Sequence, residues 1–185
     1  MENPIIQVPT ELFEPAATMQ FEGTWDMPIM KVGPDLYDFK GPVSWQVDVT
    51  NTGEALLVEG TCEVDARTAC ARCGEPAEVP LFGEVEGYFI IDGEATDTED
   101  MDADEYDILP DDHRIDMAQL IQAALLLDIP AIPLCEDDCK GLCLKCGANL
   151  NEGPCSCQDD AKQEEVKVGA NNPFAVLKDY VLESE

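Results

Sequence analysis

Hydrophobic and polar residues alternate along much of the first half of the chain. Successive side chains of a β-strand point to opposite faces, so this pattern predicts strands with one buried face. It occurs in MQFEGTW (19–25), VSWQVDV (43–49) and LLVEGTCEV (56–64), and EVPLFGEVEGYFII (78–91) supplies one or two further strands. Turn residues separate these runs, notably NTGE and Gly74–Pro76. The pattern therefore predicts an antiparallel sheet, open or barrel-like, within residues 19–133.

One segment changes from a period of two to helical spacing. Residues 115–128, IDMAQLIQAALLLD, begin with Asp116 and carry Gln119 three positions later, which is a capping-box pattern. Pro130 and Pro133 end the helix. The expected apolar face consists of Ile115, Leu120, Ile121, Ala124 and Leu127. This helix is expected to pack on the sheet, which makes the fold class α+β.

Three other segments lack a core pattern. Residues 1–18 form an irregular entry segment, and residues 92–112, with eleven acidic residues and no Lys or Arg, form a solvated loop. Residues 158–185 combine a polar linker with a short C-terminal helix that begins near Pro173. Phe174, Leu177 and Tyr180 would share one face of this helix. That face either folds back onto the protein or binds a partner.

Cysteines are concentrated in residues 134–157. The sequence Cys143-Leu-Lys-Cys146-Gly147 has the form of a zinc knuckle, in which two thiolates bind one tetrahedral ion and the glycine permits a tight turn. Cys135 and Cys139, or alternatively Cys155 and Cys157, complete the site. The upstream pair is favoured, which predicts about one structural zinc ion and some spare cysteines. An iron–sulfur cluster is an alternative for such spacings.

Three cysteines lie earlier in the chain. Cys70 and Cys73 form a second Cys-x-x-Cys-Gly unit, interpreted as thiols at a strand turn or as ligands that join the later cluster. Cys62 belongs to an apolar strand face and is predicted to be a core residue. The total of nine cysteines is odd, and the N-terminus has no basic region that would begin a signal peptide. Metal binding in a reducing cytoplasm is therefore expected instead of disulfides.

The charge of the chain restricts its partners. Forty acidic residues oppose ten basic ones, giving a formal charge of −30. Such a surface repels nucleic acid and favours a basic protein, for example a ribosomal or assembly protein, although charge of this sign also serves solubility alone. Weak direct contact with ribosomal RNA through Arg67, Arg72, Lys140 and Lys145 is the second interpretation. No membrane span and no small-molecule substrate are expected.

Catalytic motifs are absent from the sequence. It contains no HExxH, P-loop or GxSxG pattern, and its single histidine, His113, adjoins the acidic segment. The chain is therefore expected not to be an enzyme. Two alternatives remain, a zinc- or redox-responsive regulatory protein and a metal-dependent hydrolase.

Four motifs in order resemble one known family. They are TACARCGEPAEVPL, IDMAQLIQAALLLDIPAIPLC, CKGLCLKCGANLNEGPCSC and NPFAVL, within residues 45–182. Together they resemble the YceD family of large ribosomal RNA subunit accumulation proteins. The resemblance implies a cytosolic, non-catalytic protein that is associated with 23S ribosomal RNA accumulation. Members of that family differ in their number of cysteines, which implies that a metal stabilises this branch and is not the source of the shared function.

Overall fold

The structure is a computed structural model that describes residues 2–27, 29–91 and 106–157. The chain divides into two compact units, Met1–Asp138 and Cys139–Glu185. All of the helices and strands named below belong to the first unit. The expected linker and C-terminal helix, with Pro173, Phe174, Leu177 and Tyr180, lie outside the described residues.

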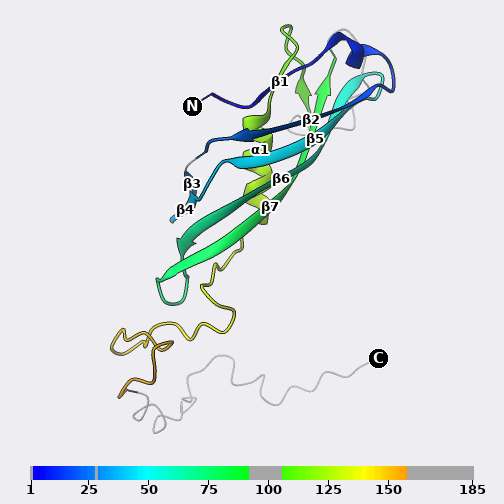
Figure 1. The fold of residues 1–185 in the computed structure, drawn as a ribbon. Coiled ribbons are helices and arrows are strands. Elements are labelled where there is room, and N and C mark those ends of the chain that lie inside the picture. Colours follow the sequence, from blue (N-terminus) through cyan, green and yellow to red (C-terminus); the bar gives the residue numbers. More distant parts are fainter. Residues whose placement is uncertain (1, 28, 92–105, 158–185) are drawn as a thin grey trace, which may run out of the picture. The chain divides into compact units, whose positions relative to one another are not determined.

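Four strands carry the alternating pattern found in the sequence. They are β2 (Thr18–Trp25), β5 (Val43–Asn51), β6 (Ala55–Ala69) and β7 (Pro76–Ile90), shown in Figure 1. β5 pairs with both β2 and β6, and β6 also pairs with β7, all antiparallel. The predicted antiparallel sheet is confirmed. The segment that was expected to give one or two strands forms only β7.

Shorter strands extend this sheet at its margins. β3 (Ile29–Val32) pairs with β4 (Asp35–Phe39), which pairs with the end of β6. β8 (Asp107–Ile108) runs parallel to the end of β7 and is followed by Leu109, which is buried. The end of the expected acidic loop is thus part of the fold, whereas residues 92–105 lie outside the described residues. Pairings among the described strands do not close into a ring, so a barrel is not confirmed.

Residues 1–18 are not the irregular segment that was expected. β1 (Ile5–Gln7) pairs antiparallel with β9 (Arg114–Asp116), and a 3-10 helix, η1, spans Thr10–Phe13. Ile6, Val8 and Leu12 are buried in the core. The prolines in this segment flank β1 and η1 and do not interrupt them. Both elements are too short for the alternation of hydrophobic and polar residues to predict them.

A buried polar side chain joins η1 to the turn after β5. The Asn51 side-chain amide donates to the carbonyl oxygen of Leu12 at 2.8 Å, and its oxygen accepts from the backbone N–H of Gly53 at 2.7 Å. Both polar atoms of the buried amide are therefore paired, which removes the cost of their desolvation. The predicted NTGE turn consequently also positions the N-terminal segment.

The predicted helix is present as α1 (Met117–Asp128), and Figure 1 shows it along β6 and β7. Asp116 is the N-cap, because its carboxylate accepts from the backbone N–H of Ala118 at 2.9 Å. None of the helices in the described part is long and apolar enough to cross a membrane.

The buried face of α1 differs from the expected one. Leu125 is fully buried and Leu127 is 87% exposed. Ile115 is buried, but it lies in β9, so the helix begins two residues later than residue 115. The actual buried face consists of Met117, Ala118, Ile121, Ala124 and Leu125.

A glycine allows α1 to approach the sheet closely. Gly83 of β7 pairs with Cys62 of β6, and a Cβ at Gly83 would lie 2.7 Å from the backbone carbon of Ala124. That distance is shorter than van der Waals contact, so only glycine fits without separating the helix from the sheet. Cys62 is 1% exposed in this core, which confirms the prediction for that residue.

We expect Gly83→Ala to lower the free energy of unfolding by about 1–3 kcal/mol, the usual cost of overpacking a core. Gly41→Ala is the matched control, because a Cβ at Gly41 would meet nothing within 4 Å. Urea denaturation of the two variants measures the difference. Equal stability of the two variants would contradict the close packing of α1 on β7.

Candidate metal centres

The turn between β6 and β7 has the hydrogen bonds and the glycine that are typical of a zinc knuckle. The backbone N–H of Cys70 donates to the carbonyl oxygen of Glu75 at 2.8 Å, and that of Gly74 donates to the carbonyl oxygen of Cys70 at 2.9 Å. Gly74 has a φ of +77°, a conformation that side chains larger than glycine rarely adopt. These hydrogen bonds fix the shape of the loop. In this shape the thiols of Cys70 and Cys73 lie on the same side of the loop, toward Cys135 and Cys139.

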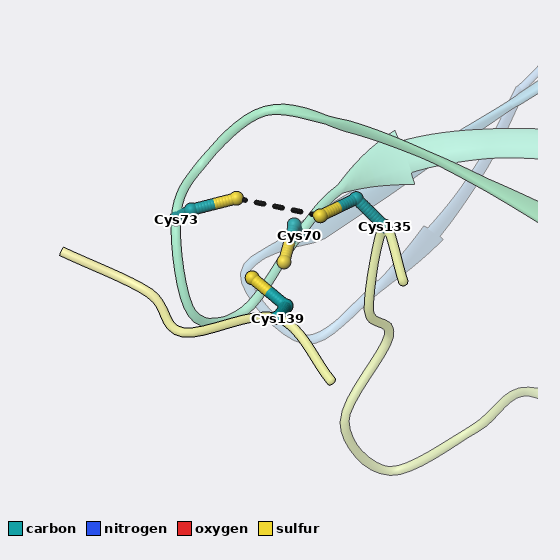
Figure 2. A group of neighbouring side chains, drawn as sticks. All are labelled: Cys70, Cys73, Cys135 and Cys139. Atoms are coloured by element: carbon teal, nitrogen blue, oxygen red, sulfur yellow. Dashed lines mark hydrogen bonds between the residues drawn. The ribbon is translucent and has the colours of Figure 1, made fainter. Parts of the chain in front are cut away.

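The segment that follows α1 meets this loop. The backbone N–H of Ala71 donates to the carbonyl oxygen of Pro133 at 2.8 Å. The Sγ atoms of Cys73 and Cys135 lie 3.6 Å apart, and Figure 2 shows both sulfurs turned toward each other. The β6–β7 turn and Cys135, which are far apart in the sequence, are therefore neighbours within the first unit.

Four sulfurs gather at this place. The Sγ atoms of Cys70, Cys73, Cys135 and Cys139 all lie within 4.8 Å of one another. Figure 2 shows these four side chains together. Cys70, Cys73 and Cys139 are buried, and Cys135 is half-buried. We call these four residues the first cysteine group.

Backbone amides prepare Cys70 for metal binding. Burial raises the pKa of its thiol, but the N–H groups of Cys135, Arg72 and Cys73 outweigh this effect and lower the pKa to about 6. Amide donors stabilise the thiolate, which is the form that binds metal. The Sγ of Cys139 also accepts a hydrogen bond from the Asn151 side chain at 3.3 Å.

The second unit contains another knuckle of the same construction. The backbone N–H of Cys143 donates to the carbonyl oxygen of Ala148 at 2.8 Å, and that of Gly147 donates to the carbonyl oxygen of Cys143 at 2.8 Å. Gly147 has a φ of +74°. A bridge between Leu142 and Asn149 closes the small hairpin that carries this loop. The positive φ expected for the glycine after each Cys-x-x-Cys is confirmed in both loops.

The sulfurs of Cys143, Cys146, Cys155 and Cys157 form the second cysteine group, again within 4.8 Å of one another. The N–H groups of Cys146 and Lys145 lower the pKa of Cys143 to about 6. A hydrogen bond with Cys146 raises the pKa of Cys157 to about 11, and one with Cys143 raises that of Cys155. The thiolate of Cys143 is thus favoured, and a bound cation would displace the protons of Cys155 and Cys157.

Either group can hold a metal ion. Four sulfurs at about 2.3 Å from a tetrahedral zinc ion lie roughly 3.8 Å from one another. The sulfurs of Cys73 and Cys135 are 3.6 Å apart, and all pairs in each group are within 4.8 Å. Four thiolates fill all positions of a tetrahedral ion and leave none open for a substrate or water. Such donor sets are typical of structural centres, whereas catalytic zinc sites keep an open position.

The structure groups the cysteines differently from the expected set of Cys135, Cys139, Cys143 and Cys146. Cys135 and Cys139 lie with Cys70 and Cys73, whereas Cys143 and Cys146 lie with Cys155 and Cys157. The expectation favoured sequence neighbours, because spacing alone gives no sign that β6 and β7 bring a turn to Cys135. Both groups correspond to alternatives from the sequence: Cys70 and Cys73 join cysteines of the later cluster, and Cys155 and Cys157 lie with Cys143 and Cys146.

Two further residues considered in the sequence lie outside both groups. Cys62 is in the hydrophobic core, where burial raises the pKa of its thiol to about 11. His113 is exposed, with a φ of +54°, and its ring contacts Phe13 at a centroid distance of 4.7 Å.

Comparison with known proteins decides the family. The sequence profile of the large ribosomal RNA subunit accumulation protein YceD matches residues 58–180, about two thirds of the chain and including both cysteine groups. The chain belongs to the YceD family. The match confirms the resemblance that the four sequence motifs indicated.

Curated relatives of this YceD-family chain come from plants and bacteria. It is 29% identical over 161 residues to the chloroplastic YCED homolog 1 of Arabidopsis thaliana, covering 73% of this chain and 50% of that protein. The Zea mays homolog 1 is 31% identical over 144 residues, covering 63% and 49%. An uncharacterised Mycobacterium bovis protein is 35% identical over 106 residues, covering 57% and 50%. The chain thus spans about half the length of these relatives. No solved structure matches it.

The environment of Cys62 predicts slow alkylation. At pH 8 a thiol with a pKa of about 11 has on the order of 100-fold less thiolate than an ordinary thiol with a pKa near 8.5. Because the folded pKa is raised, the rate should keep rising with pH above 9, where a free thiol has nearly reached its maximum. Peptide mass spectrometry after timed iodoacetamide treatment, with urea-unfolded protein as the control, measures this. Equal rates in the folded and unfolded protein would contradict the burial of Cys62.

Proposed function

We propose that this YceD-family protein is a non-enzymatic factor that supports accumulation of 23S ribosomal RNA and biogenesis of the large ribosomal subunit, and that it acts in the cytoplasm. The observation that carries the proposal is the family match over residues 58–180. The names of the Arabidopsis and maize relatives describe large ribosomal RNA subunit accumulation, which supports the same role.

The cysteine groups favour a structural over a catalytic use of metal. Both consist of thiols alone, and zinc bound by four thiolates has no free position to activate water. We therefore propose zinc as a structural ion and no enzymatic activity. The family role would then depend on what the folded protein binds.

The charge distribution favours a basic protein as partner. Asp48, Glu59 and Glu86 are exposed and lie directly opposite one another on β5, β6 and β7. Like charges in such positions repel one another and destabilise the sheet. The total charge of −30 acts in the same direction and disfavours the approach of RNA phosphates. A cationic segment of a ribosomal or assembly protein would relieve this repulsion.

The role in RNA accumulation predicts a cellular phenotype. Depletion of the protein from the cells that make it should lower the ratio of 23S to 16S ribosomal RNA, and re-expression should restore the ratio. Quantitative hybridisation to both RNAs measures it, with re-expression of an unrelated acidic protein as the control. An unchanged ratio after complete depletion would sink the proposed function.

The partner proposal predicts opposite results for protein and RNA contacts. Glu59→Gln with Glu86→Gln should reduce co-purification with ribosomal proteins, because it removes two charges that attract cations. Glu11→Gln with Glu14→Gln makes the same charge change at exposed positions elsewhere and should have a smaller effect. Removal of like-charge repulsion should leave the free energy of unfolding unchanged or raise it by about 0.2–1 kcal/mol. If the variant with Glu59→Gln and Glu86→Gln associated more strongly with ribosomal material than the unchanged protein does, direct contact with RNA would be indicated instead.

A further inference from the structure

We propose that the chain holds two separate zinc ions, one in each cysteine group, and that each site fills independently of the other. The first site consists of Cys70, Cys73, Cys135 and Cys139, and the second of Cys143, Cys146, Cys155 and Cys157. The inference extends the structural-zinc part of the proposed function, from about one ion with spare thiols to two complete sites.

The two knuckles repeat one backbone design. In each loop the first cysteine donates its N–H to the carbonyl oxygen five residues later, and the glycine donates its N–H to the carbonyl oxygen of that cysteine. Both glycines have a φ between +70° and +80°. In each loop the amides of the two residues before the glycine point at the first sulfur. The two loops therefore have the same backbone geometry, although one is a strand turn of the sheet and the other lies in a small hairpin. This geometry suits a pair of thiolates that bind one metal ion.

Each group is complete without the other. The two groups share no cysteine, and each combines one knuckle with one further pair, Cys135 and Cys139 or Cys155 and Cys157. Together they use every cysteine except Cys62, which lies in the core. Tetrahedral zinc requires four donors, so each group meets that requirement alone.

The sulfur separations favour a single ion over a cluster. Ligands of an iron–sulfur cluster surround several metal atoms, so their sulfurs lie farther apart than those around one ion. All sulfurs in each group lie within 4.8 Å. Thiolates are soft donors that suit zinc, and tetrahedral four-sulfur sites are typical of it. Zinc entry displaces the remaining thiol protons to solvent.

The two ions would have different structural effects. The first closes a long loop of chain, because Cys73 and Cys135 are 62 residues apart and β7 and α1 lie between them. The second closes only residues 143–157, a short segment with few buried side chains. Loss of the first ion should therefore weaken the sheet and α1, whereas loss of the second should affect only its own hairpin and the hydrogen bond from Asn151 to Cys139.

Metal counting on the full chain tests the proposal. Zinc is measured by elemental analysis and native mass spectrometry, and Co²⁺ alone serves as a spectroscopic probe of four-thiolate tetrahedral sites. We expect two ions in the wild type. Cys73→Ser with Cys135→Ser should retain one ion, and Cys146→Ser with Cys157→Ser should also retain one. Cys62→Ala is the matched control and should retain two.

Several outcomes would overturn the proposal. They are one ion in the wild type, iron in place of zinc, or a loss of both ions from the Cys146/Cys157 variant. If the Cys73/Cys135 variant fails to fold, the wild-type count and the Cys146/Cys157 variant still decide. Amide exchange supplies a separate readout, since the Cys146/Cys157 variant should keep the protection of β6 and β7. Two ions without any change in 23S RNA on depletion would reject the proposed function alone.

Discussion

The pairing of β6 with β7 is the constraint on which the rest of the structure depends. It runs without a break from Ala55 opposite Ile90 to Ala69 opposite Pro76. A shift by one residue would move every buried side chain of one strand to the exposed face, so burial fixes the register. The same register places Gly83 under α1 and sets the Cys70–Gly74 turn at the end of the hairpin. The register of β6 and β7 therefore determines the core, the position of α1 and the place of the first cysteine group.

Each cysteine group joins a Cys-x-x-Cys loop to a later segment of the chain. The first group joins a strand turn to the segment after the helix, and a backbone hydrogen bond from Ala71 to Pro133 links the same two segments. The second group lies in a hairpin whose side chains are mostly exposed and which could not fold on hydrophobic burial alone. Away from these groups, the exposed face of the sheet carries Asp48, Glu59 and Glu86 side by side.

Local patterns in the sequence predicted most of the strands and the helix. Features that depend on pairing between distant residues could not be predicted in this way. Alternation located β2, β5, β6 and β7, and Asp116 located the start of α1, because each signal is contained in a few neighbouring residues. β1 and η1 were missed, since their burial depends on β9 and on Asn51, which are distant in sequence. For the same reason the favoured cysteine set differs from the groups in the structure, which combine the alternatives that the spacing left open. The short spacing of the cysteines near Cys143 can be recognised in the sequence. Cys73 and Cys135 are 62 residues apart and become neighbours only when β6 and β7 form their hairpin.

X-ray absorption at the zinc edge tests most directly the claim that the two cysteine groups are metal centres. If each ion is bound by one group, the average first shell should contain four sulfur atoms at about 2.3 Å and no lighter donor. The spectrum averages over both sites, so a single mixed or partly hydrated site would be visible in it. Nitrogen or oxygen atoms in the first shell, or an average well below four sulfurs, would contradict the assignment of Cys70–Cys139 and Cys143–Cys157 as two four-thiolate centres.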